Sequence, residues 1–197
     1  NGHQPFKKLG HTMIFNGEIY NYQTIKKDLV SQGYTFETTS DTEVLLTSYL
    51  AYGEKCVEKL RGMFTFLIYD ETNHKMFGAA DHFGIKPLYY TENEDFVAFS
   101  SEYKALLPLL ERRTVDETAF QSYLSFQFVP MRKTVLKEIK KVPVGHYFCF
   151  EDQKLTFRRY YLPTYEQAPV SKEDILAIME NSVQAHMIAD VEVGTFL

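Results

Sequence analysis

Hydrophobic and polar positions along the chain fall into two kinds of block. One kind has apolar side chains at helical spacing, and before residue 162 it occurs at residues 21–32, 41–52, about 102–110 and 116–125. The other kind has short apolar or alternating runs joined by polar turns, which is typical of strands. These runs are residues 13–15, 61–70, 75–79, 88–90, 96–99, 146–150 and 154–159. Because helices and hairpins come in separate blocks, the pattern predicts an α+β fold.

The pattern breaks at residues 162–170, which contain prolines and polar side chains. A helix that begins at a serine cap, Ser171, is predicted next, and residues 191–197 then resemble the opening strand of a new domain. We therefore expect one domain over residues 1–162, with a linker and the start of a second domain over residues 163–197.

Composition and charge narrow the class of protein. The chain has 197 residues, 45% of them hydrophobic, which is enough for one good core or for one domain and part of another. A net charge of −5 with scattered lysines and arginines argues against nucleic acid or an anionic membrane as the main partner. No apolar stretch approaches the roughly 20 residues that a membrane span needs. The two cysteines, Cys56 and Cys149, match neither a disulfide framework nor a metal site, so we expect a cytoplasmic protein without a bound metal.

The first candidate site follows the apolar run at residues 13–15, which is predicted to be a buried strand that ends at Asn16-Gly17-Glu18. Asn16 brings a side-chain amide donor, and Gly17 brings a backbone N–H with no Cβ in the way. Two adjacent donors of this kind can hold the oxyanion of an acyl-transfer intermediate. The alternative is that Asn16-Gly17 is a simple turn.

The second candidate is Asp41, in the sequence Ser40-Asp41-Thr42-Glu43. These residues fit a capping box with Ser40 as the N-cap and Glu43 at the third helical position. The box leaves the Asp41 side chain free at the positive end of the helix dipole, which favours its ionised form. The alternative is that Asp41 is itself the cap. A free carboxylate beside two oxyanion donors indicates a substrate with an ammonium group and an amide, and glutamine is such a molecule.

Several stretches of the sequence match the pattern of a known family. In order, they are Gly2–Pro5, Phe15–Tyr22, Ser40–Leu46, Gly62–Phe64, Phe83–Tyr90, Ser100–Leu106, Pro143–His146 and Asp190–Leu197. Over essentially its whole length the chain resembles the glutamine-hydrolysing asparagine synthetases. In that family a class II glutamine amidotransferase domain is fused to an ATP-pyrophosphatase-type synthetase domain.

The resemblance implies a fold and a reaction. The fold is a four-layer αββα sandwich of two antiparallel sheets, of the N-terminal-nucleophile hydrolase type, followed by the first helix and strand of an α/β synthetase domain. An N-terminal cysteine attacks the amide of L-glutamine, with its own α-amino group as the base. The ammonia passes to a second site, where ATP and Mg²⁺ activate the β-carboxylate of L-aspartate as an acyl-adenylate. A homodimer is compatible with this family.

The resemblance also implies roles for residues of this chain. Asn16, through its side-chain amide, and Gly17, through its backbone N–H, form the oxyanion hole and contact glutamine. Glu18 and Asp41 hold the α-amino end of glutamine. Leu197 is a weaker candidate for backbone contacts with the adenine of ATP.

Three departures from the family pattern stand out. The nucleophilic cysteine is absent, because Cys56 follows a helix and Cys149 lies within a strand pattern. The arginine-containing stretch expected before Gly2 and the phosphate loop expected after Leu197 are absent too, which we interpret as truncation of a longer parent. Ala80 precedes Asp81 where the family usually has arginine, so a local ion pair there is in doubt.

Two other functions stay open from the sequence. One is a sister amidotransferase that acts on a different carboxylate acceptor. The other is a non-catalytic module that keeps the fold for interaction or regulation.

Overall fold

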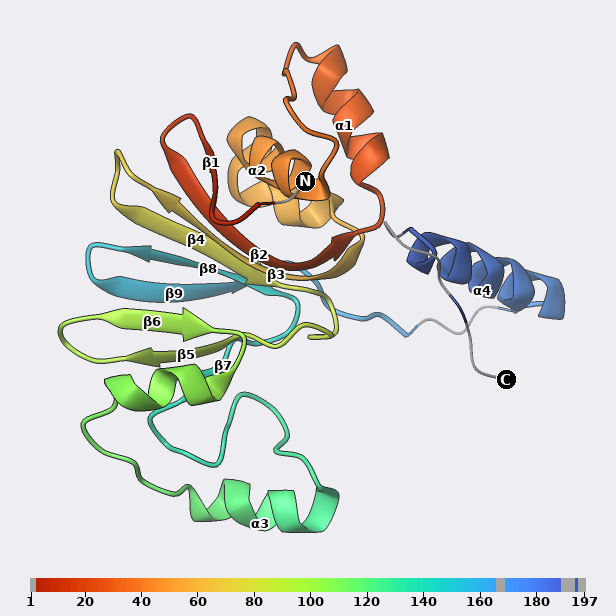
Figure 1. The fold of residues 1–197 in the computed structure, drawn as a ribbon. Helices are drawn as coiled ribbons and strands as arrows, with labels where there is room; N and C mark the ends of the chain where they lie inside the picture. The colour runs from red at the N-terminus through yellow and green to blue at the C-terminus, as the bar shows by residue number, and fades with distance from the viewer. Residues whose placement is uncertain (1–2, 166–168, 189–193, 195–197) are drawn as a thin grey trace.

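The computed structural model describes residues 3–165, 169–188 and 194 (Figure 1). Its strands are β1 (Phe6–Lys8), β2 (His11–Ile19), β3 (Gly62–Asp70), β4 (Lys75–Ala80), β5 (Tyr89–Glu92), β6 (Val97–Ser100), β7 (Lys140–Lys141), β8 (His146–Glu151) and β9 (Lys154–Arg159). Its α-helices are α1 (Tyr22–Ser31), α2 (Asp41–Tyr52), α3 (Glu117–Phe126) and α4 (Lys172–His186). Two 3₁₀-helices, η1 (Gly53–Lys59) and η2 (Tyr103–Leu109), complete the described elements.

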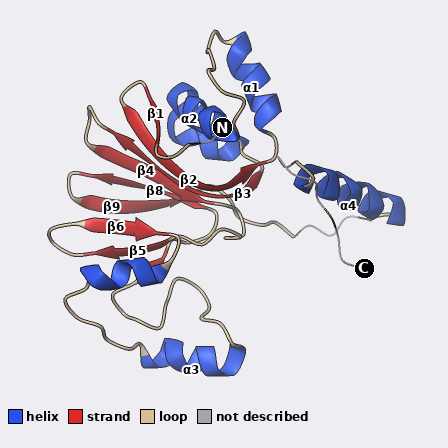
Figure 2. Cartoon of the chain, in the orientation of Figure 1, coloured by secondary structure: helices blue, strands red, loops and turns tan. Residues whose placement is uncertain are grey.

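The strands form two sheets in which all described pairs are antiparallel. The larger sheet has the order β1-β2-β3-β4-β8-β9, and the smaller has the order β6-β5-β7. The predicted α+β class with two antiparallel sheets and helices is confirmed, as Figure 2 shows. The two shortest strands, β1 and β7, were not predicted because three or two residues carry no periodic signal.

Each face of the six-stranded sheet covers its own hydrophobic core. Met13 and Phe15 of β2 belong to one cluster, together with Leu29 of α1 and Leu45 of α2. That cluster lies between the sheet and these two helices. The opposite face of the sheet contributes Phe148 to a second cluster, in which the rings of Phe148 and Phe99 of β6 stack with centroids 4.5 Å apart. The second cluster therefore lies between the two sheets.

The outer face of the small sheet also carries a helical element. Tyr90 of β5 is buried against the inner cluster, so the neighbouring Tyr89 must point outward. The Tyr89 ring meets the ring of Tyr103, at the start of η2, edge-on at 5.8 Å. Helix α3 lies farther from the sheets in Figure 1, and Ala119 is its one buried residue.

Strand β2 is longer than the sequence predicts. Its pairing with β3 runs without a break from His11↔Asp70 to Ile19↔Gly62 and includes Asn16↔Thr65 and Gly17↔Phe64. The prediction that the strand ends at Asn16 is therefore wrong, and so is the alternative that Asn16-Gly17 forms a turn. The residues of the first candidate site are therefore fixed within a strand that is paired along β3.

Helix α4 follows the domain as a separate element (Figure 2). Ser171 is its N-cap, as predicted, and forms a capping box with Asp174; none of the described side chains of α4 is buried. Its contact with the sandwich includes the ring of His186, whose centroid lies 4.5 Å from that of the Tyr20 ring, just after β2. The predicted strand at residues 191–197 lies outside the described residues, apart from Gly194. None of the described helices has the length and apolar content needed to cross a membrane.

Candidate functional site

The candidate site lies along one edge of β2, where alternate backbone groups point away from β3. The side-chain amide of Gln4 pairs with the backbone of Phe15: its Oε1 accepts from the Phe15 N–H at 2.7 Å and its Nε2 donates to the Phe15 carbonyl at 2.6 Å. Four residues on, the Ile19 N–H donates to Oδ2 of Asp41 at 3.0 Å. Backbone groups two residues apart in a strand point to the same side, so the Gly17 N–H lies on this edge between Phe15 and Ile19. The edge thus places the Gly17 donor next to the Asp41 carboxylate.

Glycine is required at position 17 for two reasons. Its φ is +144°, a conformation that other residues rarely adopt. A Cβ built at Gly17 would overlap the carbonyl oxygen of Met63 and lie 2.7 Å from Cα of Phe64. On the facing strand, a Cβ at Gly62 would overlap the carbonyl oxygen of Glu18. The two glycines let β2 and β3 approach closely beside the site.

Asn16 points to the other face of the sheet, toward the small sheet. Its side-chain Nδ2 donates to the hydroxyl of Ser101, just after β6, at 3.2 Å. The two residues line a pocket of about 210 Å³ together with Thr65 and Ser100. By strand alternation the Glu18 side chain lies on the same face as Asn16. Ser101 and Gln4 are contacts that the sequence pattern did not single out, because they lie far from Asn16 and Phe15 along the chain.

Asp41 begins α2 as predicted, but its side chain is not free. In addition to the bond from Ile19, its Oδ1 receives two long contacts, from the Ser40 hydroxyl at 3.4 Å and the Thr42 hydroxyl at 3.5 Å. Ser40 is the N-cap, as predicted, with its Oγ accepting from the Thr42 N–H at 3.1 Å. The alternative that Asp41 is the cap is therefore wrong. Of the two carboxylate oxygens of Asp41, Oδ2 is therefore bound by the Ile19 N–H, whereas Oδ1 has only the two long contacts and can accept a hydrogen bond from a ligand.

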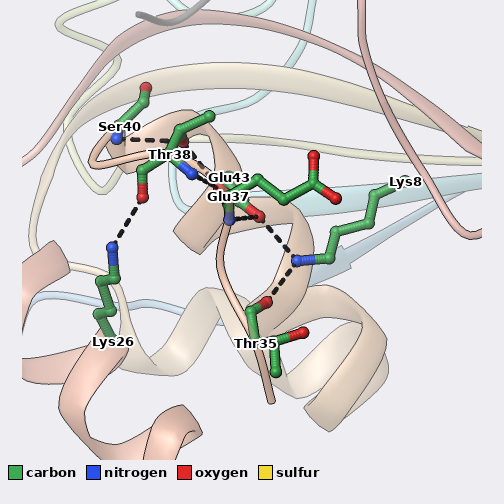
Figure 3. Close-up of polar contacts among 7 residues, drawn as sticks. All are labelled: Lys8, Lys26, Thr35, Glu37, Thr38, Ser40 and Glu43. Carbon is green, nitrogen blue, oxygen red and sulfur yellow. Dashed lines mark hydrogen bonds and ion pairs between the residues drawn. The ribbon is translucent and has the colours of Figure 1, made fainter.

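The second half of the predicted capping box is wrong. The Ser40 N–H donates to the Thr38 hydroxyl at 3.3 Å and not to Glu43. The Glu43 carboxylate turns instead toward the preceding loop and Lys8 (Figure 3). Burial by itself would raise the pKa of Glu43, but hydrogen bonds from Lys8, Glu37 and Thr38 lower that pKa to about 2.

Asp81, the third carboxylate of interest, needs no ion pair. It is only 1% exposed, and four backbone N–H groups donate to it at 2.9–3.2 Å. The donors are Phe64, Phe83, Ile85 and Lys86. Alanine at position 80 in place of the arginine usual in the family therefore leaves no unsatisfied charge at Asp81.

Neither cysteine is placed as a nucleophile. Cys56 is fully buried in η1, and burial raises the pKa of its thiol far above the ordinary value. Cys149 lies in β8, as predicted, and donates to Glu54 at 3.3 Å. Burial, followed by that hydrogen bond, raises the pKa of Cys149 to about 12. Both thiols stay protonated at neutral pH.

The described residues give no indication of a metal or nucleotide site. Within residues 3–165, 169–188 and 194, no group of three or more histidine, cysteine, aspartate or glutamate side chains is arranged to hold a metal ion. His146 begins β8, and its Nδ1 lies 2.8 Å from the Val144 carbonyl. Leu197, the predicted adenine contact, lies outside the described residues.

Comparison with known families decides the assignment. The sequence model described as "Glutamine amidotransferase domain" matches residues 1–161. The chain belongs to the glutamine amidotransferase domain family. The resemblance seen in the sequence is thereby confirmed at the level of the family.

Relatives of this amidotransferase chain carry synthetase names. "Asparagine synthetase [glutamine-hydrolyzing] 1" of Bacillus subtilis is 45% identical, over 100% of this chain and 32% of the relative. "Asparagine synthetase [glutamine-hydrolyzing] 3" of the same organism is 36% identical, over 100% of this chain and 34% of the relative. The chain thus spans about a third of the length of these curated relatives.

A solved structure supports the amidotransferase fold. The glutamine phosphoribosylpyrophosphate amidotransferase of B. subtilis, complexed with ADP and GMP, superimposes with a TM-score of 0.56 at 24% identity. The match covers 81% of this chain and 32% of that one. At this identity the likeness concerns the fold alone.

Proposed function

We propose that the edge of β2 binds L-glutamine and that this domain supports its hydrolysis to glutamate and ammonia. The observation that carries the proposal is the position of the Gly17 N–H, beside a carboxylate that is bound to the same strand edge through Ile19. An acyl-transfer site for glutamine needs donors for an oxyanion and a counter-charge for the α-ammonium group. Both requirements meet at residues 16–19 of β2: the strand carries the donors, and the Asp41 carboxylate is bound to it through Ile19.

In this proposal each residue has a separate task. The Gly17 N–H and the Asn16 amide donate to the oxygen of the substrate amide as it becomes negatively charged, and Asn16 exchanges its bond to Ser101 for this one. Asp41, through Oδ1, and Glu18 hold the α-ammonium group of glutamine. The attacking thiol belongs to an N-terminal cysteine outside this chain, since Cys56 and Cys149 are protonated and built into the core.

For the whole protein we propose glutamine-dependent asparagine synthesis. Ammonia released at β2 would reach an L-aspartate whose β-carboxylate has been activated with ATP and Mg²⁺ in a following synthetase domain. The names of the relatives and the greater length of their chains support this proposal. We place the amidotransferase domain at residues 1–162 and the linker and start of the synthetase domain, with α4 as its first helix, at residues 163–197. Contact of Leu197 with ATP and assembly as a homodimer remain predictions.

Mass mapping of the full-length protein after treatment with an electrophilic diazo-ketone analogue of glutamine tests the glutaminase site. A single adduct on an N-terminal cysteine is expected, with Cys56 and Cys149 unlabelled as internal controls. Absence of any adduct on the folded protein would contradict the proposal and favour a non-catalytic module. An adduct without asparagine formation from aspartate, ATP and glutamine would instead indicate a sister amidotransferase with another acceptor.

A further inference from the structure

Glu43 is a buried carboxylate in the first turn of α2, two residues after Asp41, and it has no task in the proposed reaction. Its side chain is 1% exposed, and its Oε1 receives the Lys8 ammonium at 2.8 Å. The N–H of Glu37 donates to both oxygens, at 3.0 and 3.1 Å. The N–H and hydroxyl of Thr38 each donate to Oε2 at 2.7 Å. One side chain thus joins β1, α2 and the loop between α1 and α2.

Two lysines hold that loop from either side, as Figure 3 shows. Lys8 of β1 donates to the Thr35 carbonyl at 2.8 Å, and Lys26 of α1 donates to the Thr38 carbonyl at 2.8 Å. Both ammonium groups also lie over the ring of Phe36, 5.0 and 4.8 Å from its centroid. Charged groups therefore contact four successive residues of the loop, 35–38, and Glu43 is the one anion among these groups.

A chain of hydrogen bonds leads from Glu43 to Asp41. The Thr38 hydroxyl donates to Glu43 and accepts from the Ser40 N–H. The Ser40 hydroxyl in turn caps α2 at the Thr42 N–H. Thr38 thus holds Ser40, the residue before Asp41, and Ser40 holds Thr42, the residue after it. The Asp41 side chain itself accepts from the Ile19 N–H of β2.

We propose that Glu43, with Lys8, is the positioning pair that fixes the loop at residues 35–40 and thereby sets where Asp41 meets the ammonium group of the substrate. This inference rests on the proposed role of Asp41 and goes beyond it, because Glu43 touches neither substrate nor reacting atoms. An amide cannot replace the carboxylate here. In Glu43→Gln the new NH₂ group faces either the Lys8 ammonium or the N–H groups of Glu37 and Thr38, all of them donors.

A double-mutant cycle in the full-length protein tests the inference. If Glu43 acts through Asp41, Glu43→Gln raises the KM for glutamine about tenfold in the wild-type background, with kcat changed less than about threefold. The same substitution in the Asp41→Asn background then raises that KM by less than about twofold, because the residue it positions has already lost its charge. A tenfold rise in both backgrounds would overturn the inference and assign Glu43 a general structural role.

Three further variants control for loss of any carboxylate, for loss of charge at Glu43 and for failure of Glu43→Gln to fold. Asp28→Asn is the matched control, because Asp28 accepts from the Tyr52 hydroxyl at 2.7 Å but has no bond to the loop at residues 35–40, and its KM for glutamine should equal that of the wild type. Glu43→Asp keeps the charge and should recover part of the lost affinity. If Glu43→Gln fails to fold, Lys8→Met, which keeps the carboxylate and removes its cation, takes its place in the cycle with the same two outcomes.

Hydrogen–deuterium exchange separates this inference from the proposed function. The Ile19 N–H, whose acceptor is Asp41, should exchange faster in Glu43→Gln than in the wild type. In Asp28→Asn its exchange rate should equal that of the wild type. Both results are expected whether or not the protein hydrolyses glutamine. Faster exchange at Ile19 in a protein without glutaminase activity would support the positioning pair and contradict the proposed function. Unchanged exchange at Ile19, with or without that activity, would overturn the positioning pair.

Discussion

Asp41, beside the edge of β2, and Asp81, after β4, both accept backbone N–H groups, but to different extents. Asp81 accepts four such groups and is 1% exposed, so both its oxygens are occupied. Asp41 is only partly buried and accepts one backbone N–H, which leaves Oδ1 with two long hydroxyl contacts. Both aspartates thus hold backbone N–H groups in place. Only Asp41 has an oxygen, Oδ1, that is left without a short hydrogen bond. We propose that the number of hydrogen bonds a carboxylate already accepts distinguishes Asp81, as a structural aspartate, from Asp41, as a binding one.

The largest effect is expected at the saturated carboxylate. Asp81→Ala removes the acceptor for four backbone N–H groups and should lower the free energy of unfolding of this domain by about 4 kcal/mol. Urea unfolding followed by pulse proteolysis of the full-length protein measures it. Asp41→Asn is the control, expected within about 1 kcal/mol of the wild type. Equal destabilisation by the two substitutions would erase the distinction between the two aspartates.

The next largest effect concerns Asn16, the proposed oxyanion donor. Asn16→Ala should lower kcat for glutamine hydrolysis by about 10²–10³-fold, since one preorganised donor to the developing negative charge is lost. Initial-rate measurements of glutamate release check this. Ser101→Ala, which removes only the hydroxyl bound to Asn16 in the free protein, should change kcat far less. An unchanged kcat in Asn16→Ala would remove Asn16 from the oxyanion hole.

A smaller effect is expected for the unsaturated carboxylate itself. Asp41→Asn should raise the KM for glutamine about thirtyfold, which corresponds to the loss of one charge-assisted hydrogen bond of about 2 kcal/mol. The kcat for glutamine hydrolysis should fall much less than in Asn16→Ala. Saturation kinetics with glutamine give both constants, and an unchanged KM would show that Oδ1 is not used by the substrate.

A third carboxylate, Glu43, extends the comparison, because its contribution to the stability of the domain depends on pH. The pKa of Glu43 is lowered from 4.5 to about 2 in the folded protein. Its stabilising contribution is therefore complete above the unfolded value and is lost as the pH falls from 4.5 toward 2. Between pH 6 and pH 3 the wild type should lose about 2 kcal/mol more unfolding free energy than Glu43→Gln. Urea midpoints at the two pH values test this, and parallel losses would show that Glu43 is not held ionised by its neighbours.

Much of the fold could be predicted from the sequence because its signals are local. The helical spacing at residues 41–52 and the apolar run at residues 61–70 correspond to α2 and β3 within one or two residues. The extent of β2 could not be predicted in this way. Asn16-Gly17 is a turn signal, and it is overridden because β3, which lies far away along the chain, approaches so closely that only glycine fits.

The site followed the same rule. Asp41 and Ser40 were placed correctly at the start of α2, because a cap depends on neighbouring residues. The role of Glu43 was predicted incorrectly, since its actual partner Lys8 lies 35 residues away on β1 and competes with the local capping geometry. Likewise, the backbone groups that satisfy Asp81 come from a loop whose shape the sequence pattern does not specify.

We propose that Asn16, Gly17 and Asp41 serve glutamine and not the later synthetase step. The most direct measurement compares asparagine formation from glutamine with asparagine formation from added ammonium salt, in full-length wild type and Asp41→Asn at subsaturating glutamine. In Asp41→Asn the glutamine-dependent rate should fall by more than about tenfold, while the ammonia-dependent rate should stay within about twofold of the wild type. An equal loss of both rates would contradict the assignment of the β2 edge to glutamine.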